Sequence, residues 1–428
     1  MITRIIRGWW YNFKFQQALK QEKFQRANYL LKKLESQSIK LPLSARLYQQ
    51  KLQAENAFLH YKQETAKLSI SLEKVTASKP LLIPESNFIE HIHQSFKPIQ
   101  HDSNKLQITG IDRIVFEQLE IALADFLETE INKVASPQKE AKLQEAVDDI
   151  LGLKQGIDPQ YSYFFSPHVY LLKYFSENVY CTYWAWFLVY QAGLLPHNLK
   201  ILDLAAGPGT VIYGLALLLL STVGFCRVPP LHISYYSLEE QATLQYRGLQ
   251  FWRSYIESLT LPLNAYFRFN TLNIFDYQEY ATKLPTNFFN FIVISHCFFY
   301  DPQQRKESHQ IYRQIFQHNL QSEGYVLLIV QGRKLFNLYD VSPTEDIAVE
   351  RTTIARFLQE LGLQLEWYQY LTSTGKRTPL KSFGKFAREN LPSQHHLSHL
   401  RQKYLQEPYV ANYCIDDYVI LAKKLEDI

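Results

Sequence analysis

Residues 199–210 read LKILDLAAGPGT and join the two kinds of local structure on which the fold depends. An apolar run ends at Asp203, a turn with Gly207 and Gly209 follows, and an apolar helical pattern begins after Thr210. Glycines let a backbone approach a ligand closely, and a helix N-terminus offers unpaired N–H groups. The stretch lacks the GxGxxG of dinucleotide-binding folds and the Lys-Ser/Thr pair of a phosphate loop. It therefore predicts a ligand-binding strand–turn–helix of another kind.

Short apolar runs recur after residue 160, and helical patterns separate most of them. Strands that alternate with helices predict an α/β fold with a parallel, doubly wound sheet. The strands that we expect are Lys200–Leu204, His232–Leu238, Ala265–Asn270, Phe289–Ser295, Gly324–Val330, Leu363–Leu371 and Asp417–Ala422.

The run at 199–210 resembles motif I of the class I, Rossmann-like S-adenosylmethionine-dependent methyltransferases, in which an acidic residue precedes three alternate glycines. Ala205 replaces the first glycine, whereas Gly207 and Gly209 match the other two. The ending IDDYVILAKKL resembles the last strand of that family, which is inserted antiparallel. The resemblance covers residues 160–371 and 413–428. It implies a seven-stranded sheet, S-adenosyl-L-methionine as cofactor, and methyl transfer.

The resemblance also implies which residues hold the cofactor. An acidic residue at the end of the second strand binds the ribose hydroxyls in the family, and Glu239 matches it, with Glu240 as the alternative. Asn273 stands where an Asp usually meets the adenine amino group, and an amide oxygen can accept the same hydrogen bond. Ile274 could pack on the adenine ring or belong to the core. The predicted cofactor-binding residues are Asp203, Ala205, Gly207, Gly209, Glu239, Asn273 and Ile274.

The fourth strand is followed by His296, which is the candidate catalytic residue. Enzymes that methylate amino groups of DNA bases or glutamine place Asn/Asp-Pro-Pro-Tyr here, and this chain does not. Neutral imidazole accepts a proton near pH 7, so His296 could act as a general base, or it could only line the pocket. The aromatic run at 161–190 could line the same pocket or form a core. Its candidates are Tyr163, His168, Tyr170, Tyr183 and Trp186.

The formal net charge of +4 conceals two basic segments. Residues 1–70 hold 13 Lys/Arg and 4 Asp/Glu, and residues 372–412 hold 7 and 2. Both could bind RNA or a protein, so RNA is slightly favoured over a small molecule as methyl acceptor. The alternative is a solvated loop at 372–412. The side chains that could contact phosphates there are Lys376, Arg377, Lys381, Lys385, Arg388, Arg401 and Lys403.

We expect four regions along the chain. Residues 1–73 would form a basic all-α module, 74–110 a linker or irregular segment, and 111–195 a helical region. Residues 196–428 would form the methyltransferase domain, with the basic insert at 372–412. A second functional hypothesis is a non-catalytic assembly or scaffold factor with this fold, for a larger complex that could be membrane-bound.

The cysteines and the apolar runs limit the remaining classes. Cys181, Cys226, Cys297 and Cys414 are scattered, which argues against a disulfide framework and against a zinc or iron–sulfur site, so no metal is expected. No apolar run reaches the ~20 residues of a membrane-spanning helix, and a cytoplasmic location is expected. Residues 2–13 place apolar side chains on one helical face. That face could lie at a membrane surface or pack on the chain's own helices.

Overall fold

The computed structural model of the chain describes residues 10–11, 13–18, 21, 24–35, 81–134, 136–151, 159–223, 225, 231–261 and 263–425. They divide into two compact units, one of Met1–Ala77 with Tyr266–Arg268 and one of the remaining chain. In the first unit, helical residues 13–18 and α2 (Phe24–Glu35) share a buried apolar cluster that includes Phe15, Leu30 and Leu34. Most of residues 1–73, and most of the face at 2–13, lie outside the described residues. The all-α module and its membrane contact therefore stay predictions.

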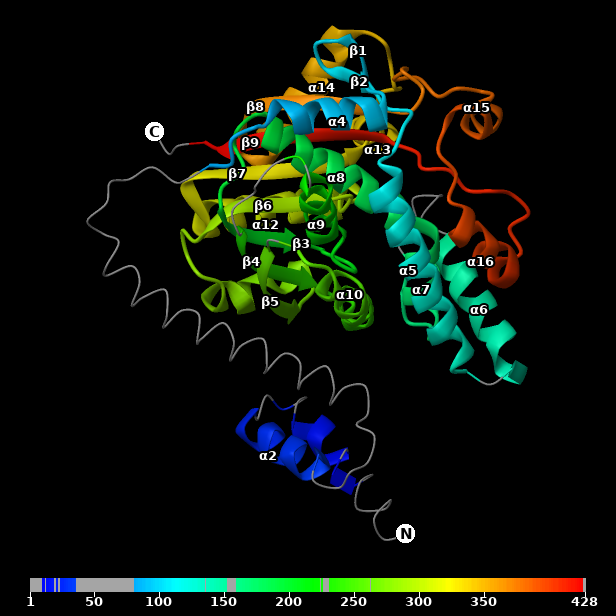
Figure 1. Cartoon of the computed structure of the whole chain (residues 1–428). Coiled ribbons are helices and arrows are strands. Elements are labelled where there is room, and N and C mark those ends of the chain that lie inside the picture. Colours follow the sequence, from blue (N-terminus) through cyan, green and yellow to red (C-terminus); the bar gives the residue numbers. More distant parts are fainter. Residues whose placement is uncertain are drawn as a thin grey trace. The chain divides into compact units, whose positions relative to one another are not determined.

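The described residues form a nine-stranded sheet in the order β1-β2-β8-β9-β7-β6-β3-β4-β5, which belongs to the second unit apart from Tyr266–Arg268 of β5 (Figure 1). Strands β3 to β9 are the seven predicted strands, so the predicted α/β class is confirmed. Their bounds are β3 Asn198–Leu204, β4 Leu231–Glu239, β5 Leu263–Thr271, β6 Phe289–Ser295, β7 Leu320–Gln331, β8 Leu363–Thr372 and β9 Asp416–Lys424.

The register of the central strands brings several strand ends together at one edge. Strand β3 pairs in parallel with β4 and β6, and Leu204 lies opposite both Leu238 and Ile294. Strand β9 runs antiparallel to both of its neighbours, β7 and β8. Residues 201–204 of β3 and 289–294 of β6 are buried, as expected for strands covered on both faces. The antiparallel insertion of the last strand agrees with the sequence prediction.

Two predictions are wrong for one reason. The sheet has more than the seven expected strands, and the added strands lie in the segment at 74–110, for which the sequence predicts a linker or irregular structure. That segment contains α4 (Ser86–Phe96) and the two edge strands β1 (Ile99–Asp102) and β2 (Lys105–Gln107). Pro84 and Pro98 flank α4 rather than interrupt it, which is where prolines are tolerated. Strands β1 and β2 carry mostly polar residues, so the sequence shows no alternation of apolar and polar residues that would predict them.

Helices cover the sheet and extend beyond it. Helices α8 (Ser176–Gln191) and α9 (Thr210–Thr222) lie across one face of the sheet (Figure 1). They approach closely, because a Cβ atom at Gly214 of α9 would lie 2.3 Å from Oγ1 of Thr182. The other helices of at least five residues in this unit are α5 Arg113–Asn132, α6 Ser136–Leu151, α7 Ser166–Tyr170, α10 Ala242–Ser254, α12 Pro302–Asn319, α13 Gly332–Asn337, α14 Ile347–Leu361, α15 Phe383–Asn390 and α16 His395–Leu405, with the π-helix η2 at Leu171–Phe175.

The basic insert at 372–412 folds into α15 and α16, and it uses two of its predicted phosphate ligands internally. Arg377 is buried, and its guanidinium donates to Asp102 of β1 at 2.9 Å and to Glu350 of α14 at 2.6 Å. Arg401 is also buried and donates to the backbone oxygens of Leu172 and Lys173 in η2, both at 2.8 Å. Neither arginine is placed to contact a phosphate, so these two predictions are corrected.

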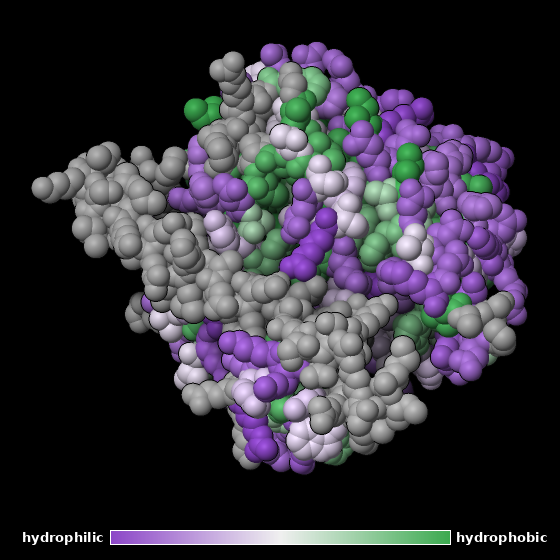
Figure 2. Space-filling view, turned by 60° about the horizontal axis from the view of Figure 1, so that its bottom comes forward, coloured by the Kyte–Doolittle hydropathy of each residue, from purple (hydrophilic) through white to green (hydrophobic). Residues whose placement is uncertain are grey.

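The remaining cations of the insert are exposed. Lys403 pairs with Glu128 of α5, and Lys385 lies 3.9 Å from Glu389. On the face in Figure 2, hydrophilic residues predominate over much of the described surface, and hydrophobic residues gather near the upper centre. Within the described part of the chain, no helix combines the length and apolarity that crossing a bilayer requires.

Candidate cofactor and catalytic site

The turn after β3 is built from backbone conformations that most side chains avoid. Ala205, Gly207 and Gly209 have φ of 52°, 53° and 85°, in the left-handed region that glycine favours. Ala205 therefore keeps the conformation of the glycine that it replaces, at the cost of some strain. Apart from its chain neighbours, no atom of the described residues would lie within 4 Å of a Cβ atom on Gly207, so this part of the structure leaves space in front of the turn.

Glu239, at the end of β4, fixes this turn. Its Oε2 accepts a hydrogen bond from the backbone N–H of Gly207 at 2.8 Å, and Oε1 accepts from Gln241 N–H at 2.8 Å. The side chain is buried, and burial raises the pKa of its carboxyl group. Glu240 is exposed and does not share this position. Of the two acidic candidates, Glu239 is thus the one that meets the glycine turn.

Asp203 lies beneath the same turn and is fully buried. Its Oδ2 accepts a hydrogen bond from the Tyr235 hydroxyl of β4, and Oδ1 is buried without a partner among the described residues. Burial raises the pKa of Asp203 to about 8, the charge of Glu239 adds to the rise, and the bond from Tyr235 opposes it. A buried acceptor without a donor costs free energy, so this oxygen calls for a partner.

Asn273 and Ile274 follow β5 and lie beside the end of β4. The backbone N–H of Leu272 donates to the carbonyl oxygen of Glu239 at 2.9 Å, which joins the two strand ends. The Asn273 side chain accepts from Phe275 N–H at 3.0 Å and so caps the short 3₁₀ turn Ile274–Asp276. Ile274 is buried. The hydrogen bond between Leu272 and Glu239 places Asn273 and Ile274 close to the glycine turn, which Glu239 also contacts. Their contacts with adenine stay predictions.

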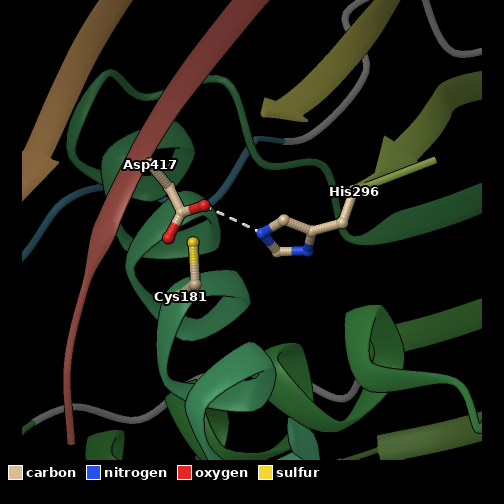
Figure 3. Close-up of side chains that lie close together, drawn as sticks. All are labelled: Cys181, His296 and Asp417. Carbon is tan, nitrogen blue, oxygen red and sulfur yellow. Dashed lines mark hydrogen bonds and ion pairs between the residues drawn. The ribbon is translucent and has the colours of Figure 1, made fainter. Parts of the chain in front are cut away.

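His296 follows β6 at the same edge of the sheet and meets two side chains from other elements (Figure 3). Its Nε2 lies 2.9 Å from Oδ1 of Asp417, on β9, and its Nδ1 lies 3.0 Å from Oγ of Ser295. The polar atoms of Cys181, His296 and Asp417 all lie within 4.8 Å of one another. Burial raises the pKa of the Cys181 thiol well above its ordinary value, so the thiol is protonated.

The trio of Cys181, His296 and Asp417 is a hydrogen-bonded cluster as it stands. The 2.9 Å separation of Nε2 and Oδ1 is a direct hydrogen bond, which already occupies the inward-facing imidazole nitrogen. The expectation that the chain holds no metal ion stays a prediction.

The aromatic run contributes one of its five candidates to this edge. Tyr170 lies close enough to Glu239 and Cys297 for both to add to the rise in its pKa that burial causes. Tyr183 instead donates to Ser221, and Trp186 donates to the carbonyl oxygen of Val211, so both belong to the core between α8 and α9.

His168 and Tyr163 also differ from the predicted pocket lining. His168 is buried beside Phe164 and Phe165, and burial lowers its pKa to about 3. Tyr163 is exposed.

Tyr235 and Asp417 are the site residues that sequence reasoning missed. Tyr235 could have been found from the alternation of β4, because it points to the same side of the sheet as Ser237 and Glu239. Asp417 lies 121 residues after His296, and its place depends on how β9 enters the sheet.

The glycine turn follows β3, near the middle of an α/β sheet, as the resemblance to the class I, Rossmann-like methyltransferases implies. Beyond the hairpin β1–β2, the strands lie in the order β8-β9-β7-β6-β3-β4-β5, and the last strand is inserted antiparallel between β7 and β8, as the sequence predicts. No family model matches this chain, and no curated protein matches it.

Several solved structures resemble the chain at low identity. A SAM-dependent methyltransferase from Methanosarcina mazei is 14% identical, with a TM-score of 0.31 over 54% of this chain and 95% of that one. Coclaurine N-methyltransferase bound to N-methylheliamine and SAH is 10% identical, with a TM-score of 0.35 over 72% of this chain and 95% of that one. The 16S rRNA methyltransferase KamB is 11% identical, with a TM-score of 0.29 over 52% of this chain and 86% of that one. At these values the assignment of the fold rests on the strand order and not on the superpositions.

Proposed function

We propose that the chain is an S-adenosylmethionine-dependent methyltransferase whose cofactor binds at the ends of β3 and β4. The observation that carries this proposal is the free space in front of Gly207, in a turn held left-handed at Ala205, Gly207 and Gly209. Ala205 is the residue of this turn that carries backbone strain, and strained residues cluster at ligand-binding and active sites. The unpartnered Oδ1 of Asp203 points to the same conclusion.

The residues present fit the cofactor. Each carboxylate oxygen can accept two hydrogen bonds, so Glu239 can hold the Gly207 N–H and still accept from ribose hydroxyls. Asn273 and Ile274 would face the adenine, and Asp203 would complete the polar floor. When bound, S-adenosylmethionine supplies an activated methyl group. His296 lies one strand away on the same edge, where it could receive the proton that the acceptor loses.

Calorimetry with S-adenosylmethionine and with its demethylated product tests this proposal. Gly207→Val would place a branched side chain in the free space and should abolish binding. Gly362→Val is the matched control, because Gly362 has a similar φ of 64°, caps α14, and its nearest neighbour is the flexible Arg313 side chain at 3.4 Å. Both variants carry similar backbone strain, so only steric exclusion separates them. Equal affinities in folded Gly207→Val and Gly362→Val would refute the site.

The acceptor is the finer part of the proposal, and RNA is the one to test first. Exposed cations remain on the insert after Arg377 and Arg401 are set aside, among them Lys376, Lys381 and Arg388. They could contact phosphates without sequence preference. A non-catalytic scaffold, the alternative function, need not bind the cofactor, so an absence of binding heat in the same calorimetry would favour it.

A further inference from the structure

The imidazole of His296 is held at both nitrogens and at its backbone. The backbone N–H of His296 donates to the carbonyl oxygen of Ile329 on β7 at 2.9 Å, which ties the residue to the neighbouring strand. Its φ of 63° is uncommon for a residue with a side chain, and such conformations persist where the surroundings over-determine them. The ring then reaches β9, where Asp417 contacts Nε2 (Figure 3). The backbone anchor and the contact with Asp417 together fix both the position and the direction of the ring.

The identities of the partners decide which nitrogen carries the proton of the neutral ring. A carboxylate can only accept hydrogen bonds, so Oδ1 of Asp417 requires the proton on Nε2. Nδ1 is then the basic nitrogen, and its neighbour is the Ser295 hydroxyl at 3.0 Å, which can turn its hydrogen away from Nδ1 when an acceptor approaches. We propose that Asp417 is a positioning residue that keeps the Nδ1 lone pair of His296 available as the proton acceptor of the methyl transfer. The role in catalysis rests on the proposed function, whereas the tautomer does not.

The other groups near the ring support this assignment. From α8, the Cys181 thiol is protonated and carries no charge against the ring. On β9 the adjacent Asp416 is engaged elsewhere, because its Oδ1 accepts from the Tyr370 hydroxyl at 2.5 Å. Asp417 is therefore the carboxylate that the described structure pairs with His296.

The proton balance of the step defines what kind of acceptor needs this arrangement. The acceptor atom forms a bond to the methyl carbon while the electron pair of the broken S–C bond stays on sulfur. The bond between that acceptor atom and its hydrogen breaks, and the proton passes to Nδ1 of His296. The base is of use to an acceptor that loses a proton on methylation, such as a hydroxyl group, and of no use to a tertiary amine.

Nitrogen NMR of histidine-labelled, cofactor-free protein at alkaline pH tests the tautomer directly, since free imidazole is neutral there. His296→Gln identifies the His296 signals. We expect wild-type His296 to carry its proton on Nε2. In Asp417→Asn the amide can donate to Nε2, so the ratio of tautomers should move toward Nδ1–H by about tenfold or more, which is the worth of one hydrogen bond. Asp416→Asn is the matched control and should leave the ratio unchanged.

A structural role for Asp417 alone would change the melting temperature and leave the tautomer as it is. The proposal is overturned if wild-type His296 carries its proton on Nδ1, or if Asp417→Asn and Asp416→Asn give the same ratio. These measurements use no cofactor. A failure of cofactor binding in calorimetry would therefore refute the methyltransferase function and leave the assignment of the tautomer standing.

Discussion

Replacing Gly248 by alanine should damage the cofactor site from outside it. Gly248 lies on α10, which packs against the glycine turn, and a Cβ atom there would be 2.0 Å from the carbonyl oxygen of Pro208 and 2.8 Å from its Cα. Pro208 lies between the two glycines of the turn. Both close atoms are backbone atoms, so no side chain can rotate away to make room.

The magnitude follows from the distances. Ordinary contact begins at 3.4 Å, so the 2.0 Å separation must grow by 1.4 Å through movement of α10 or of the turn. Helix α10 is also fixed by the Tyr213 hydroxyl, which donates to the Gly248 carbonyl oxygen at 2.8 Å. Overpacking of this kind costs about 1–3 kcal/mol of stability. A displacement near 1 Å in a site can lower its performance by about 10²-fold, so affinity for S-adenosylmethionine should fall about 10- to 100-fold.

Denaturant unfolding and calorimetry on the same Gly248→Ala protein measure both effects. Gly384→Ala is the control, because Gly384 is an exposed position of α15 whose Cβ would meet only the Arg388 side chain at 4.0 Å. Gly384 is the second residue of α15, so that variant should gain less than the ~0.5–1 kcal/mol that removing a mid-helix glycine gives. Wild-type affinity and stability in Gly248→Ala would show that the contact with Pro208 does not hold the turn.

Two further predictions concern charge. Burial raises the pKa of Asp203 to about 8. Protonation of Asp203 thus stabilises the fold fully below about pH 4 and progressively less as the pH rises through about 8. Asp203→Asn, which resembles the protonated acid, should gain stability relative to the wild type between about pH 5 and pH 8 in denaturant unfolding, and a constant difference would contradict the burial argument. If the insert at 372–412 binds RNA, the affinity for RNA should fall steeply as the salt concentration rises. Replacing Lys381, Lys385 and Arg388 by Glu should lower that affinity for all RNA sequences alike. Salt-independent binding in a filter assay would turn the search toward another acceptor.

The sequence could predict the strands and helices that are buried, because buried elements consist mostly of apolar residues. Strand β6 is apolar except for Asn290 and Ser295, and its bounds agree with those expected from the sequence. Strands β1 and β2 lie at the edge, where a polar sequence is tolerated, so they carry no comparable pattern. Strand β2 pairs with β8, and the buried Arg377 also bonds to Asp102 of β1. A basic residue looks the same in a sequence whether it is solvated or buried in an ion pair.

The site shows the same division. Gly207 and Glu239 could be predicted because a short motif and a strand end fix their positions along the chain, and the structure joins them by a hydrogen bond. Asp417 could not, because which of two adjacent aspartates faces His296 depends on the register of β9 with β7 and β8. Side chains alternate between the two faces of a strand, so a shift by one residue would exchange Asp416 for Asp417.

The insertion of β9 between β7 and β8 has a consequence for the order in which the protein can mature during synthesis. Asp417 emerges 121 residues after His296, and until β9 arrives, β7 and β8 lack the partner strand that lies between them in the finished sheet. A ribosome that adds about 5–20 residues per second needs several seconds to cover that distance. Once each has been made, β7 and β8 present unpaired edges until β9 arrives, and such edges are sites for aggregation and for chaperone capture. A nascent chain that ends before β9 would carry the glycine turn complete and His296 without its carboxylate, so the ability to hold a cofactor would arise before the proposed proton acceptor is in place.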